Sequence, residues 1–325
     1  NVYIAAAIDV NSGATLTITP GSNVFFCGEY RLKVGTLFTA GRLVARGTPD
    51  QPIAFQSADG GVVWNGLVFE NNLESDPSIV QFAEFSGGGG SDPTNGHTIQ
   101  VISRAAVPDF HTPLIDNVTI GESSGYGIDL ETDAANDPTP PLVTNVTISN
   151  TTLAPIIADA AAVTGLGTGL TLISNTPNRI AVRGGQLGFD QRWRDHGVPY
   201  EILDHVYARS SYPEGEVRPA VWTIDPGVVL LIHPDRDLSV GSLSSEGALK
   251  ALGTSTNPIT FTRLSDTSAP WGSLQLNANN DFDSELRHVR LIYGGGRAAT
   301  GSQSVILKHS NGELRLDNVT VQHSF

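Results

Sequence analysis

The segment GRLVARGTPDQPIAF, at Gly41 to Phe55, recurs in the second half of the chain as GALKALGTSTNPITF, at Gly247 to Phe261. Both segments place Gly, Leu, Ala, Gly-Thr and Pro-Ile-x-Phe at the same internal positions. Their separation is 247 − 41 = 206 residues, and the same separation joins ITPG at 18–21 to IDPG at 224–227. Two matches in register indicate an internal repeat, which has to be settled before a fold is assigned.

The repeat continues beyond these segments. With a one-residue slip Trp64 falls on Trp271, and the segment DNVTI at 116–120 later matches DNVTV at 317–321. The sequence therefore predicts one long repeat at residues 1–197, followed by part of a second at residues 198–325.

The composition is that of a β-rich protein. The chain has 35 glycines and 19 prolines in 325 residues, only 16% of its residues are charged, and it has no methionine. Apolar residues lie in short β-branched runs between Gly, Pro, Asn and Asp, which is typical of short strands and turns. The pattern predicts an irregular joint between the repeats at 183–200, and strands that include Ala14 to Thr19, Arg42 to Ala45, Ile53 to Gln56, Ile79 to Phe85 and Leu114 to Ile120.

Charge and hydropathy exclude two classes of partner. The formal net charge is −14, whereas binding to a phosphate backbone needs clustered Lys and Arg. No apolar run approaches the roughly 18 residues of a membrane-spanning helix. We therefore expect no nucleic-acid partner and no membrane insertion.

The single cysteine, Cys27, follows two phenylalanines and is expected to be a small buried hydrophobe. A chain that starts at Asn1 without a signal peptide is expected to be a segment of a larger protein.

Short strands with frequent turns and no helices leave the sandwich, barrel, propeller and parallel β-helix as candidate folds. Several runs of Val, Ile and Leu lack in/out alternation, and a 206-residue repeat is far longer than a propeller blade of roughly 40 to 50 residues. These features favour an all-β, right-handed parallel β-helix, a solenoid that forms one elongated body with coils of about 20 to 25 residues.

The order of several motifs is similar to that of a known group. ATLTITPGSNVFF at 14–26, the repeat segment at 41–55, WNGLVFE at 64–70 and VQFAEFSGGG at 80–89 follow one another. This order resembles the right-handed parallel β-helix repeats of bacterial cell-surface and secreted proteins in the pectin-lyase-like superfamily. The resemblance implies a β-helix at an extracellular or cell-surface location. It does not imply one function, because this architecture carries polysaccharide lyases, hydrolases, phage tailspikes, adhesins and passive stalks.

A polysaccharide-cleaving β-helix needs convergent carboxylates, either as calcium ligands or as an acid/base pair. One series has about the spacing of stacked coils: Glu29, Asp50, Glu70, Asp92 and Asp116. This spacing is weak evidence for a site, because with 33 acidic residues among 325 many approximately regular series occur by chance. In the second copy Thr256 replaces Asp50 and Asn277 replaces Glu70, so the two copies share scaffold residues rather than ionisable ones.

Other motifs give weaker indications. The eight histidines form no HExxH motif and have no cysteine partners, which disfavours a zinc site. Trp64 and Trp271 are expected to pack at the edge of the core, whereas Trp193 and Tyr200, in the joint, are the candidates for outward sugar stacking. The Asn residues of the Asn-Val-Thr segments at 117, 145 and 318 are expected to join a hydrogen-bond ladder at a turn.

The sequence favours a non-catalytic structural or adhesive module, such as a stalk, fibre or surface-display segment of a larger extracellular bacterial protein. The alternative is a carbohydrate-active enzyme or carbohydrate-binding module with its site in a groove along the solenoid. We assign no catalytic and no cofactor-binding residue and expect no cofactor, while the sequence leaves a structural calcium ion in a turn open. The expected partners are polysaccharides, or neighbouring repeats or subunits that pair with the open ends of the solenoid.

Overall fold

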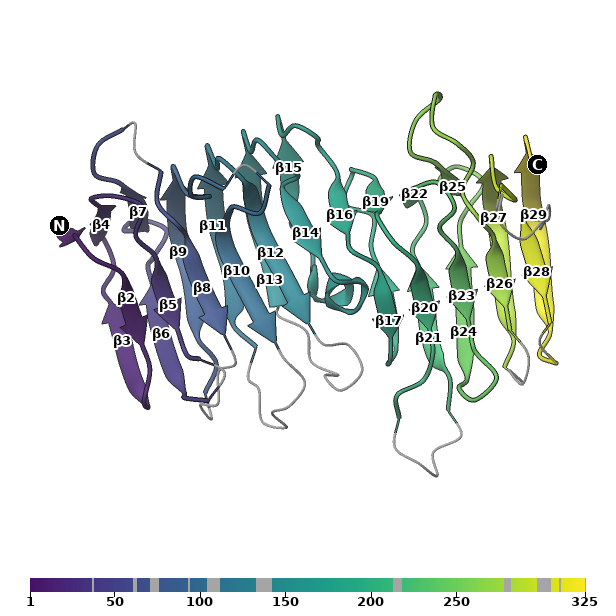
Figure 1. Ribbon diagram of the computed structural model, residues 1–325, viewed down its shortest axis with the longest axis horizontal. Helices are drawn as coiled ribbons and strands as arrows, with labels where there is room; N and C mark the ends of the chain where they lie inside the picture. The colour runs from purple at the N-terminus through teal and green to yellow at the C-terminus, as the bar shows by residue number, and fades with distance from the viewer. Residues whose placement is uncertain are drawn as a thin grey trace. The chain divides into compact units, whose positions relative to one another are not determined.

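The computed structural model describes residues 1–36, 38–60, 63–70, 76–92, 94–103, 112–132, 142–212, 218–277, 282–296, 305–309 and 311–324. These residues form short strands that pair in parallel (Figure 1), which confirms the predicted all-β, parallel β-helix class. Within these ranges, no helix is long and apolar enough to cross a membrane. The strands form two compact units.

The first unit contains two parallel sheets. One runs in the order β1, β4, β7, β9, β11, β13, β15, with β3 and β6 attached; the other runs β2, β5, β8, β10, β12, β14. The strands are β1 (Val2–Ile4), β2 (Ile8–Val10), β3 (Ala14–Ile18), β4 (Asn23–Phe26), β5 (Leu32–Val34), β6 (Gly41–Arg46), β7 (Ile53–Ser57), β8 (Leu67–Glu70), β9 (Ile79–Ser86), β10 (His97–Ser103), β11 (Leu114–Gly121), β12 (Tyr126–Thr132), β13 (Leu142–Ser149), β14 (Ile156–Ala158) and β15 (Thr171–Ile173).

The second unit contains the remaining strands and most of a short 3-10 helix, η1 (Ala160–Gly165). A separate sheet in this unit runs in the order β17, β20, β23, β26, β28. The strands are β16 (Ile180–Val182), β17 (Gly185–Leu187), β18 (Gln191–Trp193), β19 (Tyr200–Ile202), β20 (Val206–Ala208), β21 (Ala220–Ile224), β22 (Val229–Ile232), β23 (Leu238–Val240), β24 (Gly247–Leu252), β25 (Ile259–Arg263), β26 (Leu274–Leu276), β27 (Ser284–Ile292), β28 (Ile306–Lys308) and β29 (Leu314–Gln322).

The coils are more variable in length than the sequence suggested. Tyr200 pairs with Ile180, a separation of 200 − 180 = 20 residues, but Leu274 pairs with Leu238, a separation of 274 − 238 = 36 residues. The expected 20 to 25 residues hold only for the shortest coils, because the loops between strands differ widely in length. Residues at that fixed spacing therefore do not generally stack.

Long strands form where two short strands of the preceding coil merge, and they bend at the junction. The first part of β9 pairs with β6 and the second part with β7; β27 continues β24 and β25 in the same way. At each bend one residue adopts a left-handed conformation, with φ between 48° and 53° at Phe82, Asn117, Asn145, His288 and Asn318. Asn tolerates this conformation better than most residues, which explains the recurrent Asn-Val-Thr.

The core confirms some side-chain predictions and overturns others. Trp64 and Trp271 are fully buried, as expected. Trp193 and Tyr200 are buried too, so the prediction that they face outward is wrong. The region taken for an irregular joint forms regular strands, β17 and β18, whose inward side chains fill the core. Cys27 is exposed rather than buried, because it directly follows the inward-facing Phe26 at the end of β4.

Candidate binding site

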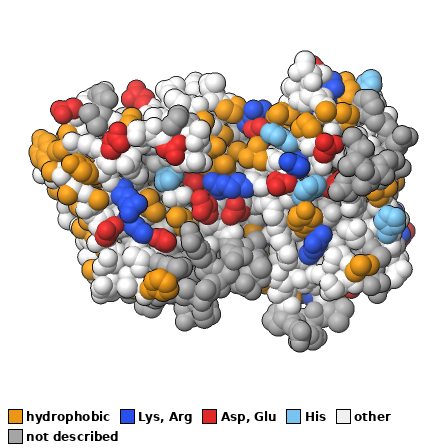
Figure 2. Space-filling view, in the orientation of Figure 1, with side chains coloured by type: hydrophobic (Ala, Val, Ile, Leu, Met, Phe, Trp, Pro, Cys, Tyr) orange, Lys and Arg blue, Asp and Glu red, His pale blue; other side chains and the backbone are white. Residues whose placement is uncertain are grey.

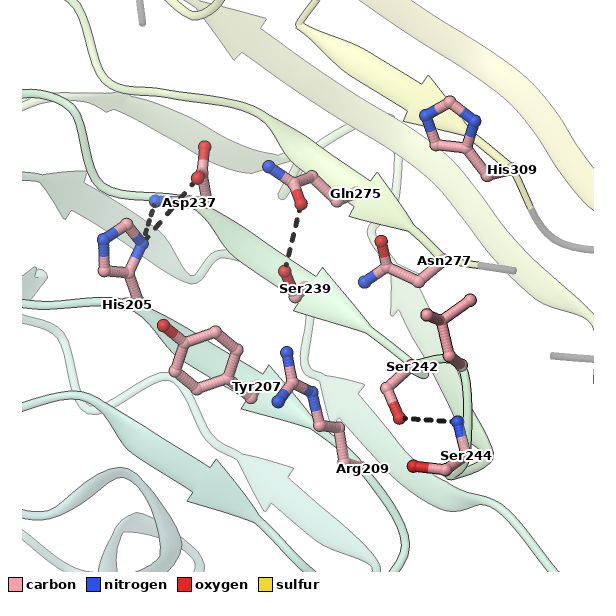
Figure 3. Close-up of a pocket in the computed structure, with 11 residues that line it drawn as sticks. His205, Tyr207, Arg209, Asp237, Ser239, Ser242, Ser244, Gln275, Asn277 and His309 are labelled. Carbon is pink, nitrogen blue, oxygen red and sulfur yellow. Dashed lines mark hydrogen bonds and ion pairs between the residues drawn. The ribbon is translucent and has the colours of Figure 1, made fainter. Parts of the chain in front are cut away.

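The second unit has a hollow on the outer face of its β17–β20–β23–β26–β28 sheet (Figure 3), with a volume of about 640 Å³. Strand alternation explains its lining, because alternate residues of β20, β23 and β26 point away from the core. The register places three such residues, Tyr207, Ser239 and Gln275, side by side on neighbouring strands. The full lining is His205, Tyr207, Arg209, Asp237, Ser239, Ser242, Leu243, Ser244, Gln275, Asn277 and His309.

The segment His205 to Arg209 supplies one wall of the hollow. The guanidinium carbon of Arg209 lies 4.3 Å from the centroid of the Tyr207 ring, and the His205 ring stacks on the same tyrosine with centroids 6.0 Å apart. Stacking on an aromatic face leaves the in-plane N–H groups of a guanidinium free to point outward. The Nε atom of Arg209 is buried and has no hydrogen-bond partner among the described residues.

Asp237 has a structural role at the base of the hollow. Its buried carboxylate accepts hydrogen bonds from the backbone N–H and the hydroxyl of Ser273, at 2.9 and 3.1 Å. The backbone N–H of Asp237 donates to Nδ1 of His205 at 2.9 Å, which places the histidine proton on Nε2 in this arrangement. The acid is thus held by neighbouring donors rather than presented to solvent.

A row of amides and hydroxyls forms the floor of the hollow, and each member is tied to its neighbours. Gln275 donates to the hydroxyl of Ser273 at 3.2 Å, and Asn277 donates to the carbonyl of Gly241 at 3.0 Å. Such bonds fix the remaining donors and acceptors before a ligand arrives. Groups of this kind suit a hydroxyl-rich ligand, and Arg209 suits a carboxylate.

A single carboxylic acid lies among the described residues that line the hollow. Asp237 is the only carboxylic acid among the lining residues that the structure describes, whereas glycoside hydrolysis normally uses two flanking carboxyl groups. Across the described ranges, no group of three or more His, Cys, Asp or Glu side chains is arranged to hold a metal ion.

The corresponding face of the first unit carries charged and polar pairs. Lys33 on β5 forms an ion pair with Glu70 on β8. Gln100 on β10 donates to Asp129 at 3.2 Å and to Glu131 at 3.1 Å. Figure 2 shows acidic, basic and histidine side chains lying next to one another on the molecular surface. The Lys33 and Gln100 side chains therefore already have acidic partners.

The structure does not bring the acidic series of the sequence together. Glu29 accepts a hydrogen bond from the Ser91 hydroxyl, Asp50 lies exposed in the turn between β6 and β7, and Glu70 pairs with Lys33. Asp92 accepts hydrogen bonds from the backbone and hydroxyl of Thr94 and from Asn95, which lower its pKa.

The last member of the series, Asp116, belongs to the ladder that was predicted for the Asn-Val-Thr segments. Partial burial opposes its ionisation, but hydrogen bonds from Asn145, Gln81, Thr144 and Asn117 outweigh burial and lower its pKa. The four bonds occupy both carboxylate oxygens. Asn117 and Asn145 both donate to Asp116, which links neighbouring coils as the ladder prediction requires, but they lie at bends inside β11 and β13 rather than at a turn, and Asn318 donates to the adjacent Asp317. Asp116 is a structural residue.

Sequence reasoning missed the residues of the hollow. The available signal was the segment HVYAR at 205–209, in which His205, Tyr207 and Arg209 alternate with small apolar residues. Such alternation indicates one buried and one solvent-facing side of a strand.

A scan against protein-family models, a search of curated proteins and a search of solved structures each found no match to this chain. The resemblance to pectin-lyase-like repeats therefore stays a prediction.

Proposed function

We propose that this chain is a non-catalytic structural and adhesive β-helix module of an extracellular or cell-surface protein, and that the hollow on β20, β23 and β26 is its saccharide contact. The observation that carries the proposal is the lining of the hollow. It combines a stacked Tyr207–Arg209 pair with fixed amides and hydroxyls, and its one acid is held by Ser273.

The ligand that fits this lining is a polysaccharide with carboxylate groups. Amide and hydroxyl groups such as those of Ser239 and Gln275 exchange hydrogen bonds with sugar hydroxyls. Arg209 can pair with a sugar carboxylate in a two-point contact, which is stronger than a neutral hydrogen bond. Because the whole chain carries a net charge of −14, a local cation is needed for an anionic ligand to approach.

The test is a binding and cleavage screen of the purified chain against neutral and uronate-rich polysaccharides. We expect uronate-rich chains to bind without release of reducing ends or of unsaturated products. Arg209→Gln should weaken this binding by about tenfold or more, since the charge-assisted contact is lost. The matched control is Arg192→Gln, which removes an exposed arginine of the same unit that pairs with Asp225 outside the hollow.

Three results would overturn the proposal. Cleavage of any polysaccharide would replace the non-catalytic module with the enzyme alternative. Binding that survives Arg209→Gln and Tyr207→Ala unchanged would move the contact away from this hollow, and absence of binding to all saccharides would remove the adhesive role.

A further inference from the structure

The turn between β23 and β24 adds an apolar side chain to the polar hollow. Leu243 is 75% exposed, and it is the one aliphatic side chain among the described residues that line the hollow. Its neighbours Ser242 and Ser244 belong to the same lining (Figure 3). A single exposed leucine is ordinary on a protein surface. Leu243 differs from such a residue because it borders the donors and acceptors of a candidate binding site.

Hydrogen bonds fix the conformation of this turn. The backbone N–H of Ser242 donates to the carbonyl of Ser245 at 2.8 Å, and that of Ser244 donates to the hydroxyl of Ser242 at 3.2 Å. The hydroxyl of Ser245 donates to the carbonyl of Ser210 at 2.7 Å, which ties the turn to the chain just after β20. A ligand therefore meets Leu243 on a backbone that is already ordered, which lowers the entropic cost of the contact.

The first unit has the same turn, 242 − 36 = 206 residues earlier. The backbone N–H of Thr36 donates to the carbonyl of Thr39 at 2.9 Å, and that of Phe38 donates to the hydroxyl of Thr36 at 3.2 Å. Phe38 is 82% exposed. The two copies thus share the hydrogen bonds of the turn and an exposed apolar side chain at its tip, and in the second copy that side chain lies in the lining of the hollow.

We propose that the hollow recognises an acidic saccharide that carries an acetyl group. The carboxylate binds Arg209, the acetyl methyl packs on Leu243, and the acetyl carbonyl accepts a hydrogen bond from the hydroxyl of Ser242. That hydroxyl accepts a bond within the turn, and a hydroxyl that accepts one hydrogen bond can still donate its own hydrogen. This inference rests on the proposed saccharide contact and names the substituent that the contact selects.

Other apolar substituents of a sugar match the lining less well. A methyl ester would remove the negative charge that pairs with Arg209. The methyl group of a deoxy sugar has no carbonyl oxygen to accept a bond from Ser242. An acetyl group leaves the carboxylate intact and supplies both the methyl and the acceptor. Burial of its methyl group against Leu243 is worth about fourfold in affinity.

The test measures the affinity of the purified chain by isothermal titration calorimetry. The first pair of ligands is an O-acetylated uronate polysaccharide and the same sample after mild alkaline removal of its acetyl esters. A polymer of alternating uronate and N-acetylhexosamine is the third ligand, and it distinguishes an amide-linked from an ester-linked acetyl group. Leu243→Ser removes the methyl contact, whereas Leu243→Met keeps an apolar side chain. Phe38→Ser is the matched control, because it removes the exposed apolar side chain from the same turn of the first unit.

We expect the unmodified chain to bind at least one acetylated polymer about fourfold or more tightly than the de-esterified sample. Leu243→Ser should remove this difference and should change the affinity for the de-esterified sample by less than about twofold. Leu243→Met and Phe38→Ser should both keep the difference. Far-UV circular dichroism confirms that each variant is folded before binding is measured.

Two results would overturn this inference alone. Leu243→Ser could leave the affinity for both acetylated polymers unchanged, or the acetylated and de-esterified samples could bind equally while the N-acetylated polymer binds no more tightly. In either case, uronate binding that Arg209→Gln still weakens would leave the proposed function in place. Absence of binding to all three ligands would overturn the proposed saccharide contact together with this inference.

Discussion

The sheet segment β5–β8–β10 in the first unit and the segment β23–β26–β28 in the second have the same backbone arrangement and different surfaces. The inward positions align in the same register, with Leu32, Leu67 and Ile99 in one copy and Leu238, Leu274 and Ile306 in the other. At outward positions the first copy has the Lys33–Glu70 ion pair, where the second has Ser239 and Asn277 beside the hollow.

The interior contacts of the two copies match in detail. The indole N–H of Trp64 donates to the carbonyl of Ser86 at 3.0 Å, and that of Trp271 donates to the carbonyl of Ile292 at 2.8 Å. A glycine starts β6 and β24, where a Cβ atom would lie 1.9 Å from the Val10 carbonyl or 2.2 Å from the Ala208 carbonyl. The repeat therefore preserves packing and backbone approach, while the outer face is free to diverge toward different contacts.

The first prediction has the largest expected effect. It tests whether the equivalent core tryptophans stabilise the two units equally. Trp64→Ala and Trp271→Ala should each destabilise their unit by about 3 to 5 kcal/mol, because each leaves a large cavity and an unpaired carbonyl. The measurement is urea unfolding followed by far-UV circular dichroism. If one substitution costs less than about 1 kcal/mol, the two sites are not equivalent in packing and the comparison fails.

The second prediction concerns His196, which follows β18 in the second unit. Burial lowers its pKa to about 4, with a further contribution from Arg194, and its Nε2 atom has no hydrogen-bond partner. Because the pKa in the folded state is below that in the unfolded state, the unfolded chain takes up a proton on His196 near pH 6.5 and the folded chain does so only near pH 4. The free energy of unfolding should therefore have its full value above about pH 6.5 and be about 3 kcal/mol lower at pH 4.

Urea unfolding of the second unit at several pH values, followed by tryptophan fluorescence, measures this loss. His196→Phe should remove most of the pH dependence in that range. A variant with the same pH slope as the unmodified chain would show that other groups cause the loss.

The third prediction examines a matched side-chain bond. The hydroxyl of Ser78 accepts the backbone N–H of Leu43 at 3.1 Å, and that of Ser284 accepts the N–H of Leu249 at 3.1 Å. Both serines are buried. Ser78→Ala and Ser284→Ala should each cost about 1 to 3 kcal/mol, because a buried donor loses its acceptor. Ser265→Ala, at an exposed position, is the control and should stay within about 0.5 kcal/mol; unequal losses at the two buried sites would break the match.

The sequence allowed prediction of the features that depend on inward residues and turns. The 206-residue repeat and the short β-branched runs predicted the parallel solenoid, because buried packing repeats from coil to coil. Outward features could not be predicted in the same way. The hollow depends on loops of different length that bring Ser242 and Asn277 near Tyr207, and loop length hides the true spacing between stacked residues. Trp193 and Tyr200 were misassigned because neighbouring glycines and charges resemble a surface joint, although both side chains fill the core.

The fourth prediction has the smallest expected effect. It replaces two outward residues of the first unit with the residues at the same positions of the second unit. Lys33→Ser and Glu70→Asn, made separately, each leave one partner of the ion pair alone; made together, they give the first unit the Ser and Asn of the second. Lys33 is 19% exposed and Glu70 is 15% exposed, so the pair is less screened than most surface pairs. A double-mutant cycle by urea unfolding should give a coupling energy of about 1 kcal/mol.

The matched control for this cycle is the pair of Arg192 and Asp225, in which the arginine side chain is 59% exposed. The cycle of Arg192→Ser and Asp225→Asn should give a coupling of at most about 0.5 kcal/mol, and salt should reduce it further. Equal coupling in the two cycles would mean that the first unit's outer face is as solvated as an ordinary surface. The ion pair of the first unit would then not distinguish its outer face from the face that carries the hollow in the second unit.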